Sequence, residues 1–412
     1  MKFLVSIILF LLTLQTQARR IVVNPSGSVK TIAEGLTLVK NGDTLLITTG
    51  TYKESNLVIN HSIVIRGEGN PVIDGQLKNE IILIKANGVV VEGLTIKNGG
   101  YSSYNDIAAL RIVNVRDVVI RNNHIYNTFF GIYSQHGTRC VISGNTLRSN
   151  AADEQNSANG IHCWKSDSMQ IFNNTISGHR DGIYFEFVTN SLVKGNKSFS
   201  NVRYGLHFMF SNDDSYQGNE FWNNGAGVAV MYSHHVTMER NIFRENWGAA
   251  AYGLLLKEIS DGSISGNRFL QNSTAILMEG SNRLMVRENI FDKNGWALRI
   301  QASCDGNVIE RNNFTGNSFD IATNGSLVLN RFDDNYWDKY EGYDLDRNNV
   351  GDVPYRPVSI YSLITERNPT ALMLFRSFMV SLLDRSEKVL PGLTPENLKD
   401  DHPRMRPHRL NK

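Results

Sequence analysis

The chain has 412 residues, with 42 Lys and Arg against 40 Asp and Glu and a formal net charge of +2. This near balance gives no electrostatic case for binding nucleic acid. Its three cysteines, Cys140, Cys163 and Cys304, form neither a disulfide framework nor a zinc motif. We therefore expect stability to come from packing.

The first element is an export signal. Lys2 is followed by an apolar run over residues 3–14, a polar stretch and Ala18. The run has about 12 residues, whereas a membrane-spanning helix needs roughly 20. We interpret residues 1–18 as a secretory signal peptide, so the mature chain starts at Arg19, with no Cys there for a lipid anchor. The alternative is a short hydrophobic core segment.

An internal repeat then dominates the chain. Asn-x-(Ile/Leu/Phe) recurs at Asn123, Asn145, Asn174, Asn196, Asn219, Asn241, Asn267, Asn289, Asn312 and Asn330, with Ser198 as the one exception at the apolar position. Most spacings are 22 or 23 residues, and a second Asn follows most copies five residues later. Three short strands per period make one turn of a parallel β-helix, whose stacked turns bury a continuous core while Asn occupies the corners.

The repeat predicts an all-β fold, a right-handed parallel β-helix over residues 19–337. A leucine-rich repeat would need Leu-x-x-Leu-x-Leu spacing, which the repeats of residues 19–337 lack. Residues 29–39 place Ile32, Leu36 and Val39 on one helical face, which predicts a short helix covering the open amino end. The opening turns resemble those of pectate-lyase-like β-helices.

The chain after the repeat divides into three segments. Residues 338–368 are irregular, acidic and Pro-rich; within them Asp344, Asp346, Asn348 and Asp352 place oxygen atoms at intervals typical of calcium loops. The terminal Glu of an EF-hand is missing, so a solvated acidic turn explains these residues equally well. Residues 369–390 predict an amphipathic helix, either an end cap or a docking helix for a membrane partner. Residues 391–412 form a polar tail, of which residues 401–412 are expected to be disordered.

A further strand in each turn carries the candidate site. Alternate residues of a strand point to opposite faces, so the apolar positions, including Cys163, face the core. One outward row then holds Tyr133, His162, Tyr184, His207 and Ala229, and its neighbour holds Trp164, Glu186, Met209, Met231 and Lys257. Thioether and imidazole groups suit Cu(I), whereas calcium favours carboxylates.

We therefore predict transient binding of Cu(I) at His207, Met209 and Met231, with Glu186 and His162 as further ligands. The alternative is that the two methionines pack beneath loops inserted near residues 151–159 and 247–251.

Carbohydrate chemistry is a second interpretation of the same strands. A β-helix lyase or epimerase needs a base and a means of neutralising the uronic acid. Glu186, Lys257, Glu279 and Arg299 supply carboxylates and cations, but they are spread over several turns with methionines between them. An Asp-Pro-His-Asp cluster of the alginate-epimerase kind is absent from the sequence. We expect an accessory protein without a catalytic centre.

Five motifs stand out, at residues 181–187, 203–212, 225–233, 335–338 and 351–357. They resemble the NosD family of periplasmic accessory proteins for nitrous oxide reductase, and the similarity covers nearly all of the mature chain. The resemblance implies work with an ABC transporter, made of a permease and an ATPase subunit, at the inner membrane. It also implies a role in assembling the copper–sulfide centre of nitrous oxide reductase, with a copper chaperone as a further partner. The sequence has no Walker-type Gly-rich loop, so energy must come from a partner.

Overall fold

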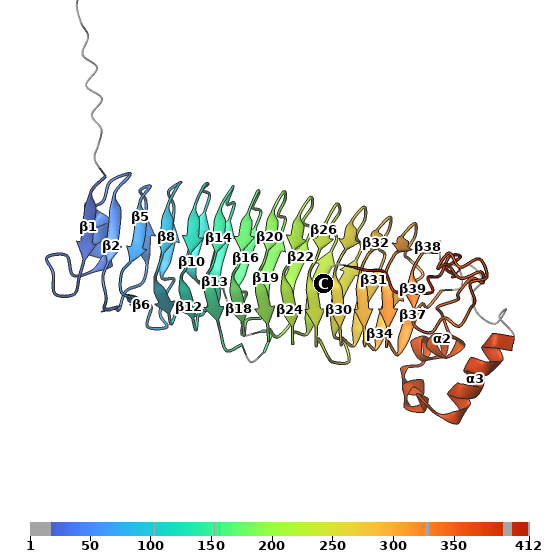
Figure 1. Cartoon of the computed structure of the whole chain (residues 1–412). Coiled ribbons are helices and arrows are strands. Elements are labelled where there is room, and N and C mark those ends of the chain that lie inside the picture. The colour runs from blue at the N-terminus through green and yellow to red at the C-terminus, as the bar shows by residue number, and fades with distance from the viewer. Residues whose placement is uncertain are drawn as a thin grey trace, which may run out of the picture.

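The protein is a long rod built from short stacked strands. The structure is a computed structural model that describes residues 18–102, 104–151, 153–155, 157–325, 329–389 and 398–410. The helices α2 (Ile360–Arg367) and α3 (Phe378–Val389) lie at the carboxyl-terminal end of the rod (Figure 1). Apart from Ala18, the predicted signal peptide lies outside the described residues.

Three parallel sheets run along the rod, and each turn contributes short strands to them in order. The first sheet contains β1 (Arg20–Val23), β2 (Thr44–Ile47), β5 (Val64–Gly67), β8 (Val90–Glu92), β11 (Val119–Arg121), β14 (Val141–Ser143), β17 (Gln170–Phe172), β20 (Leu192–Lys194), β23 (Ser215–Gln217), β26 (Thr237–Glu239), β29 (Ser263–Ser265), β32 (Met285–Arg287), β35 (Val308–Glu310) and β38 (Arg331–Asp333). The second contains β4 (Leu57–Ile59), β7 (Ile82–Ile84), β10 (Ala108–Val113), β13 (Phe130–Gln135), β16 (Ile161–Trp164), β19 (Asp181–Glu186), β22 (Tyr204–Met209), β25 (Ala226–Met231), β28 (Tyr252–Lys257), β31 (Thr274–Glu279), β34 (Trp296–Ile300) and β37 (Phe319–Ala322). The third contains β3 (Thr51–Tyr52), β6 (Val72–Asp74), β9 (Thr95–Lys97), β12 (His124–Tyr126), β15 (Thr146–Arg148), β18 (Thr175–Ser177), β21 (Lys197–Phe199), β24 (Glu220–Trp222), β27 (Ile242–Arg244), β30 (Arg268–Leu270), β33 (Ile290–Asp292), β36 (Asn313–Thr315) and β39 (Tyr336–Trp337). The predicted parallel β-helix is confirmed.

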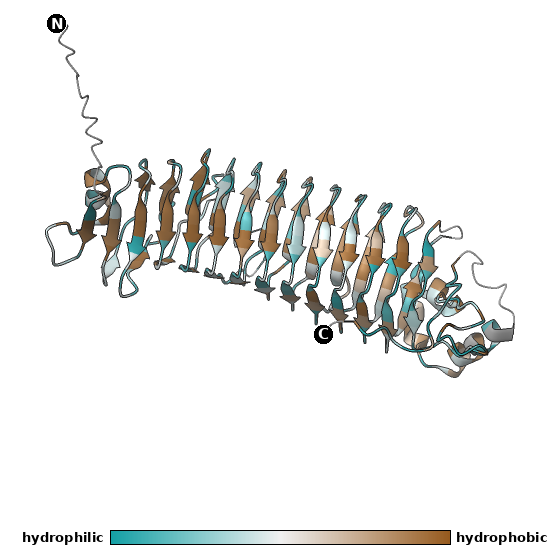
Figure 2. Ribbon diagram, turned by 45° about the horizontal axis from the view of Figure 1, so that its top comes forward, coloured by the Kyte–Doolittle hydropathy of each residue, from teal (hydrophilic) through white to brown (hydrophobic). Residues whose placement is uncertain are grey.

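The inward side chains of the three sheets form one continuous hydrophobic core. Figure 2 shows that hydrophobic residues recur on strand after strand along the rod. In the third sheet one inward position is aromatic in six successive turns: Phe221, Phe243, Phe269, Phe291, Phe314 and Trp337. Neighbouring rings stack with centroids 4.1 to 5.6 Å apart. Burying each such ring contributes about 1.5–3 kcal/mol, so this column is a main source of stability.

A ladder of buried asparagines joins the turns. Asn219 is typical: its backbone N–H and its amide both donate to Asn241 Oδ1 at 3.0 Å, and the amide also donates to the Val193 carbonyl at 3.0 Å. The ladder contains Asn123, Asn145, Asn174, Asn196, Asn219, Asn241, Asn267, Asn289, Asn312 and Asn335. Each member satisfies backbone groups at a corner, so burial of these amides carries little penalty.

The prediction that Asn330 is the last Asn of this ladder was wrong. The spacing of 18 residues from Asn312 to Asn330 breaks the period, and the structure instead pairs Asn312 with Asn335 at 3.0 Å. Asn330 accepts from Asn307 on a different corner, at 2.8 Å. The motif Asn-x-apolar occurs at both corners, so the motif alone does not distinguish them.

A short helix covers the amino end, as predicted. Helix α1 (Ile32–Leu38) buries Ile32, and the hydroxyl of Thr31 accepts from the Glu34 backbone N–H at 3.1 Å. The Glu54 carboxylate accepts from the N–H groups of Ile32 and Ala33 at 2.8 and 2.9 Å. Negative charge at a helix amino end stabilises it.

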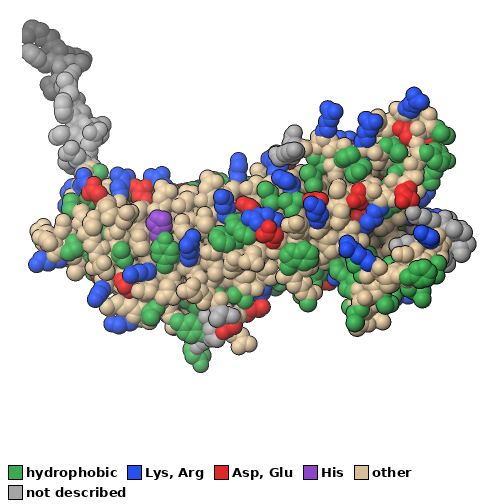
Figure 3. Space-filling model, turned by 60° about the horizontal axis from the view of Figure 1, so that its bottom comes forward, with side chains coloured by type: hydrophobic (Ala, Val, Ile, Leu, Met, Phe, Trp, Pro, Cys, Tyr) green, Lys and Arg blue, Asp and Glu red, His purple; other side chains and the backbone are tan. Residues whose placement is uncertain are grey.

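The helical part at the other end differs from the single helix predicted over 369–390. Residues Pro369–Leu374 form a 3-10 helix, and α3 starts at Phe378 after Arg376, whose φ of 62° is incompatible with a continuous helix. Helix α2, within the segment predicted to be irregular, is held to the second sheet because Glu366 accepts from Arg299 at 2.8 and 3.1 Å. Exposed hydrophobic side chains gather on this helical part (Figure 3).

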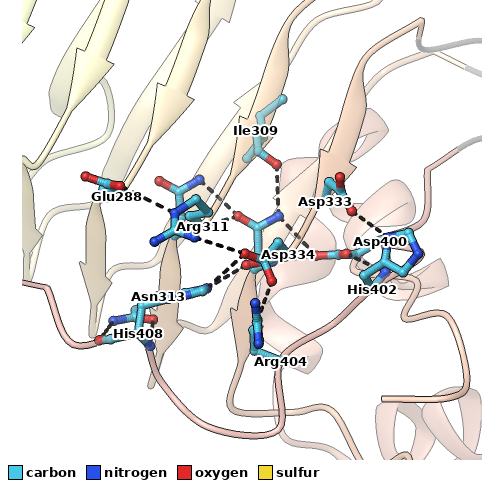
Figure 4. Close-up of polar contacts among 12 residues, drawn as sticks. Glu288, Ile309, Arg311, Asn313, Asp333, Asp334, Asp400, His402, Arg404 and His408 are labelled. Atoms are coloured by element: carbon cyan, nitrogen blue, oxygen red, sulfur yellow. Dashed lines mark hydrogen bonds and ion pairs between the residues drawn. The ribbon is translucent and has the colours of Figure 1, made fainter. Parts of the chain in front are cut away.

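The tail is also more ordered than predicted. Residues 398–410 pack against the last turn of the rod, and Asp400 is fully buried there (Figure 4). Its Oδ2 accepts from the Asn335 backbone and amide and from the Trp337 indole, each at 3.0 Å. Asp400 thus ends the asparagine ladder, since the last Asn would otherwise leave its donors unpaired. The prediction of disorder is wrong for residues 401–410.

Across the described residues, no helix is both long enough and apolar enough to cross a lipid bilayer.

Candidate functional site on the second sheet

The two rows predicted from the sequence are the rows that the structure pairs. Glu186, Met209 and Met231 are direct neighbours on β19, β22 and β25. On the parallel row, His162, Tyr184 and His207 follow one another on β16, β19 and β22. Cys163 faces the core and is fully buried, as expected.

The His row is covered, which corrects the expectation of an exposed ligand face. His162 and His207 are only 7% and 4% exposed. The rings of Tyr133, His162, Tyr184 and His207 form a column with centroids 4.6 to 4.7 Å apart. Phe130 lies over His162, and Tyr204 packs edge-on against His207. The strand alternation gave the direction of these side chains correctly, but it could not show that neighbouring aromatic residues cover them.

His207 is a buried imidazole beside a buried ion pair. Asp181 is fully buried and receives two hydrogen bonds from Arg203, at 2.9 and 2.5 Å. Burial raises the pKa of the Asp181 carboxyl, but the hydrogen bonds and charge of Arg203, together with the neighbouring His207, outweigh burial and hold that pKa at about 2. Asp181 Oδ2 lies 3.5 Å from His207 Nδ1, an electrostatic contact rather than a hydrogen bond.

Both imidazoles on this row are neutral near pH 7. Burial lowers the pKa of His207 and lowers the pKa of His162 to about 3. Among the described residues, neither ring nitrogen of His207 has a hydrogen-bond partner. A neutral imidazole with an unpaired nitrogen is the form that binds a metal ion. His162 Nε2 lies 3.9 Å from a Glu186 oxygen, and the Tyr184 ring separates His162 from His207.

The neighbouring row is more accessible and is bordered by aromatic residues. Met209 and Met231 are half-buried, and the Tyr184 hydroxyl donates to Met209 Sδ at 3.5 Å. Phe187, Phe210 and Tyr232 directly follow Glu186, Met209 and Met231 in the sequence; they are 44%, 40% and 39% exposed. Their rings stack with centroids 5.2 and 5.1 Å apart. We call the surface formed by Met209, Met231, Phe187, Phe210 and Tyr232 the Met-aromatic face.

The sequence analysis missed the aromatic half of this face. Phe187, Phe210 and Tyr232 have φ values of 53°, 51° and 53°, in the left-handed region where Asn and Gly are favoured. Each bulky residue there costs about 1 kcal/mol. The available signal was an aromatic residue directly after each outward Met, recurring at the β-helix period of 22 or 23 residues.

The predicted calcium residues use their carboxylates within their own loop. Asp344 accepts from the Asn348 and Asn349 N–H groups at 3.1 and 2.9 Å, and Asp352 accepts from the Leu345 N–H at 2.7 Å. Asp346 accepts from the Asn348 N–H at 3.2 Å. Calcium binding there stays a prediction.

The residues considered for carbohydrate chemistry are not gathered at one point. Lys257 and Glu279 are paired neighbours on β28 and β31, but Arg299 is engaged by Glu366 of α2. Arg299 therefore fixes the helical part to the rod.

Comparison with known proteins identifies the family. The family model described as "Periplasmic copper-binding protein (NosD)" matches residues 143–345, and the one described as "Right handed beta helix region" matches residues 17–168. The chain belongs to the NosD family. It is 27% identical over 389 residues to the "Probable ABC transporter binding protein NosD" of Pseudomonas aeruginosa, covering 90% of this chain and 91% of that protein. It is 26% identical to the protein of the same name from Stutzerimonas stutzeri, covering 87% of this chain and 85% of that protein.

Solved structures share the fold of this NosD-family chain. The catalytic unit of a GH87 α-1,3-glucanase from Streptomyces thermodiastaticus superposes with a TM-score of 0.61 at 12% identity, covering 77% of this chain and 69% of that one. The surface adhesin PfbA of Streptococcus pneumoniae superposes with a TM-score of 0.51 at 14% identity, covering 77% of this chain and 90% of that one. At such identities the likeness concerns the fold alone, since one fold carries many functions.

Proposed function

We propose that this chain is a periplasmic accessory protein that assists assembly of the copper–sulfide centre of nitrous oxide reductase and has no catalytic activity of its own. It would work with an ABC transporter permease and its ATPase subunit, a copper chaperone and the reductase. Membership of the NosD family supports this role, because the family is described as periplasmic and copper-binding and two relatives are named as ABC transporter binding proteins.

The Met-aromatic face carries the copper part of the proposal. Met209 and Met231 lie on adjacent paired strands, about 5 Å apart at the backbone, so two thioethers can approach one ion. Thioether donors favour Cu(I) over harder cations. The neutral His207 lies two residues before Met209 on the same side of β22, and Glu186 is the direct neighbour of Met209 on the preceding turn. His162 is the weakest of the predicted ligands, because the Tyr184 ring separates it from His207.

The aromatic half of the face supports a docking role for the same surface. Three exposed rings beside two methionines make an apolar patch on the surface of the rod, and such patches are typical of protein contacts. A chaperone that binds here would bring its copper site next to the two thioethers. Copper would then pass from the chaperone's ligands to thioethers of similar chemical softness.

The helical part at the carboxyl end is the proposed contact with the permease. Phe378 is 83% exposed, and Leu374, Met379 and Leu382 are exposed beside it. Arg299 of β34 and Gln301, which directly follows that strand, both contact Glu366, so movement of the helices would reach the rod directly. ATP-driven motion of the transporter would act through this contact.

The experiment for this role is maturation of nitrous oxide reductase in a host lacking its own NosD. We expect Met209→Ala/Met231→Ala to lower the copper content and activity of the reductase. Met285→Ala removes a half-buried outward methionine from the first sheet and is the matched control. Full maturation with the double variant would overturn the proposal.

The permease contact needs point substitutions rather than truncation, because deleting residues 369–412 would also remove the buried Asp400. We expect Phe378→Asp to abolish co-purification with the transporter while leaving the melting temperature unchanged. Unaltered co-purification would place the contact elsewhere.

The carbohydrate-active alternative is not favoured. The relatives are named as binding proteins, and Arg299 is committed to Glu366.

A further inference from the structure

A second cluster of metal-ligating side chains lies at a corner of the rod, away from the buried His row. Asp213 follows β22, and His234 and His235 follow β25 one turn later. All three are exposed, and one ligand atom from each lies within 4.8 Å of the other two. Within the described ranges, this is the one group of three His, Cys, Asp or Glu side chains that meets this criterion.

The distances within the cluster match those of ligands around one ion. His234 Nδ1 lies 3.3 Å from His235 Nδ1, and His235 Nδ1 lies 3.0 Å from Asp213 Oδ1. A tetrahedral ion with ligands at about 2.0–2.1 Å separates neighbouring ligand atoms by about 3.3 Å. Two imidazole nitrogens that face each other at this distance need either a proton or a cation between them.

The backbone of both corners is fixed, so the three donors are held in place. The Asp213 N–H donates to the His234 carbonyl at 3.2 Å, and the His235 N–H donates to the Ser260 carbonyl at 3.1 Å. The His234 N–H donates to Asn212 Oδ1 at 2.9 Å. Ordered donors lose less conformational entropy when a metal ion binds.

We propose that Asp213, His234 and His235 bind a divalent transition-metal ion, Zn²⁺ or Cu²⁺. Two imidazoles and one carboxylate suit borderline divalent ions, whereas Cu(I) prefers sulfur and calcium prefers six or more oxygens. Asp261 on the next turn does not add a ligand, because both its oxygens accept from Arg283 at 2.7 Å. The fourth position of a tetrahedral ion is therefore open to water or to a side chain of a partner.

This site goes beyond the proposed copper delivery and does not depend on it. It uses no methionine, and it binds a different oxidation state or a different metal. A partner that supplies the fourth ligand would be held at the corner beside Tyr232, at the border of the Met-aromatic face.

The test is titration of the mature, metal-free protein with Zn²⁺ by calorimetry and with Cu²⁺ by electron paramagnetic resonance. We expect one equivalent of each ion and a Cu²⁺ spectrum with hyperfine coupling to two nitrogens. His234→Ala/His235→Ala should weaken binding at least tenfold, since loss of even outer-shell groups costs about 10–100-fold. Asp213→Asn should weaken it while retaining both nitrogen couplings.

His136→Ala is the matched control, because His136 is an exposed corner histidine that also has a left-handed backbone, with φ of 52°. Equal binding by the wild type and the His234/His235 double variant, or a spectrum without two nitrogens, would overturn the proposal. The result is separable from copper delivery, because the same double variant should bind Cu(I) normally.

Discussion

Replacing Arg203 by Ala should destabilise the protein strongly near neutral pH and much less in acid. The change removes both hydrogen bonds to Asp181, whose carboxylate is fully buried. Removing one partner of a buried ion pair costs about 3–5 kcal/mol. The depression of the Asp181 pKa from about 3.9 to about 2 accounts for about 2–3 kcal/mol of this loss.

The pH dependence follows from the sign of that pKa shift. In the wild type the folded-state pKa of Asp181 lies below the unfolded value, so its contribution is present above about pH 4 and is lost as pH falls toward 2. Without Arg203, only His207 and the Tyr204 backbone N–H still oppose burial, so the pKa of Asp181 should rise. The difference in unfolding free energy between wild type and variant should therefore shrink as pH falls from 7 to 4.

Urea unfolding followed by circular dichroism at pH 7 and pH 4 measures this difference. Arg283→Ala is the control, because Arg283 pairs with Asp261 on the exposed surface and should contribute about 0–1 kcal/mol. A loss below about 1 kcal/mol for Arg203→Ala, or a loss that is the same at both pH values, would refute the reasoning.

Three further predictions concern single side chains. Burial raises the pKa of Asp214 to about 8, so the folded protein loses stability as pH rises from about 4 to 8. Asp214→Asn should therefore raise the melting temperature at pH 7, because the amide is uncharged and its oxygen can still accept from the Ser191 N–H. Phe269→Ala opens a cavity in the aromatic column and should lower the unfolding free energy by about 3–5 kcal/mol in the same urea assay. Phe210→Asn should leave the protein equally or more stable, because Asn tolerates the left-handed backbone, yet should weaken binding of a copper chaperone measured by calorimetry.

The sequence predicted the solenoid well because its period is carried by many repeats. Buried Asn and inward apolar residues recur every 22 or 23 residues, so an error at one turn leaves the rest unaffected. The last turn was misassigned because Asn330 fits the motif whereas Asn335, with Trp337 at the apolar position, does not; the pairing with Asn312 shows that Asn335 belongs to the ladder. The tail was misjudged because its polar composition conceals Asp400, a single carboxylate that meets the end of the ladder.

The sequence predicted which way the side chains of the candidate site point, but not that its histidines are buried. Alternation along β22 placed His207 and Met209 on one side of the strand, but the cover over His207 comes from Tyr204 and from Tyr184 of the preceding turn. Such cover depends on ring orientations that the period does not specify. The cluster of Asp213, His234 and His235 was not predicted, because its members come from two different turns of the sequence.

Binding of Cu(I) by the Met-aromatic face can be measured by anaerobic titration against a competing chelator. The mature protein should bind Cu(I) stoichiometrically, and Met209→Ala/Met231→Ala should lose that binding while Met285→Ala retains it. Equal Cu(I) affinity in the wild type and the double variant would contradict the claim and would leave the face as a docking surface alone.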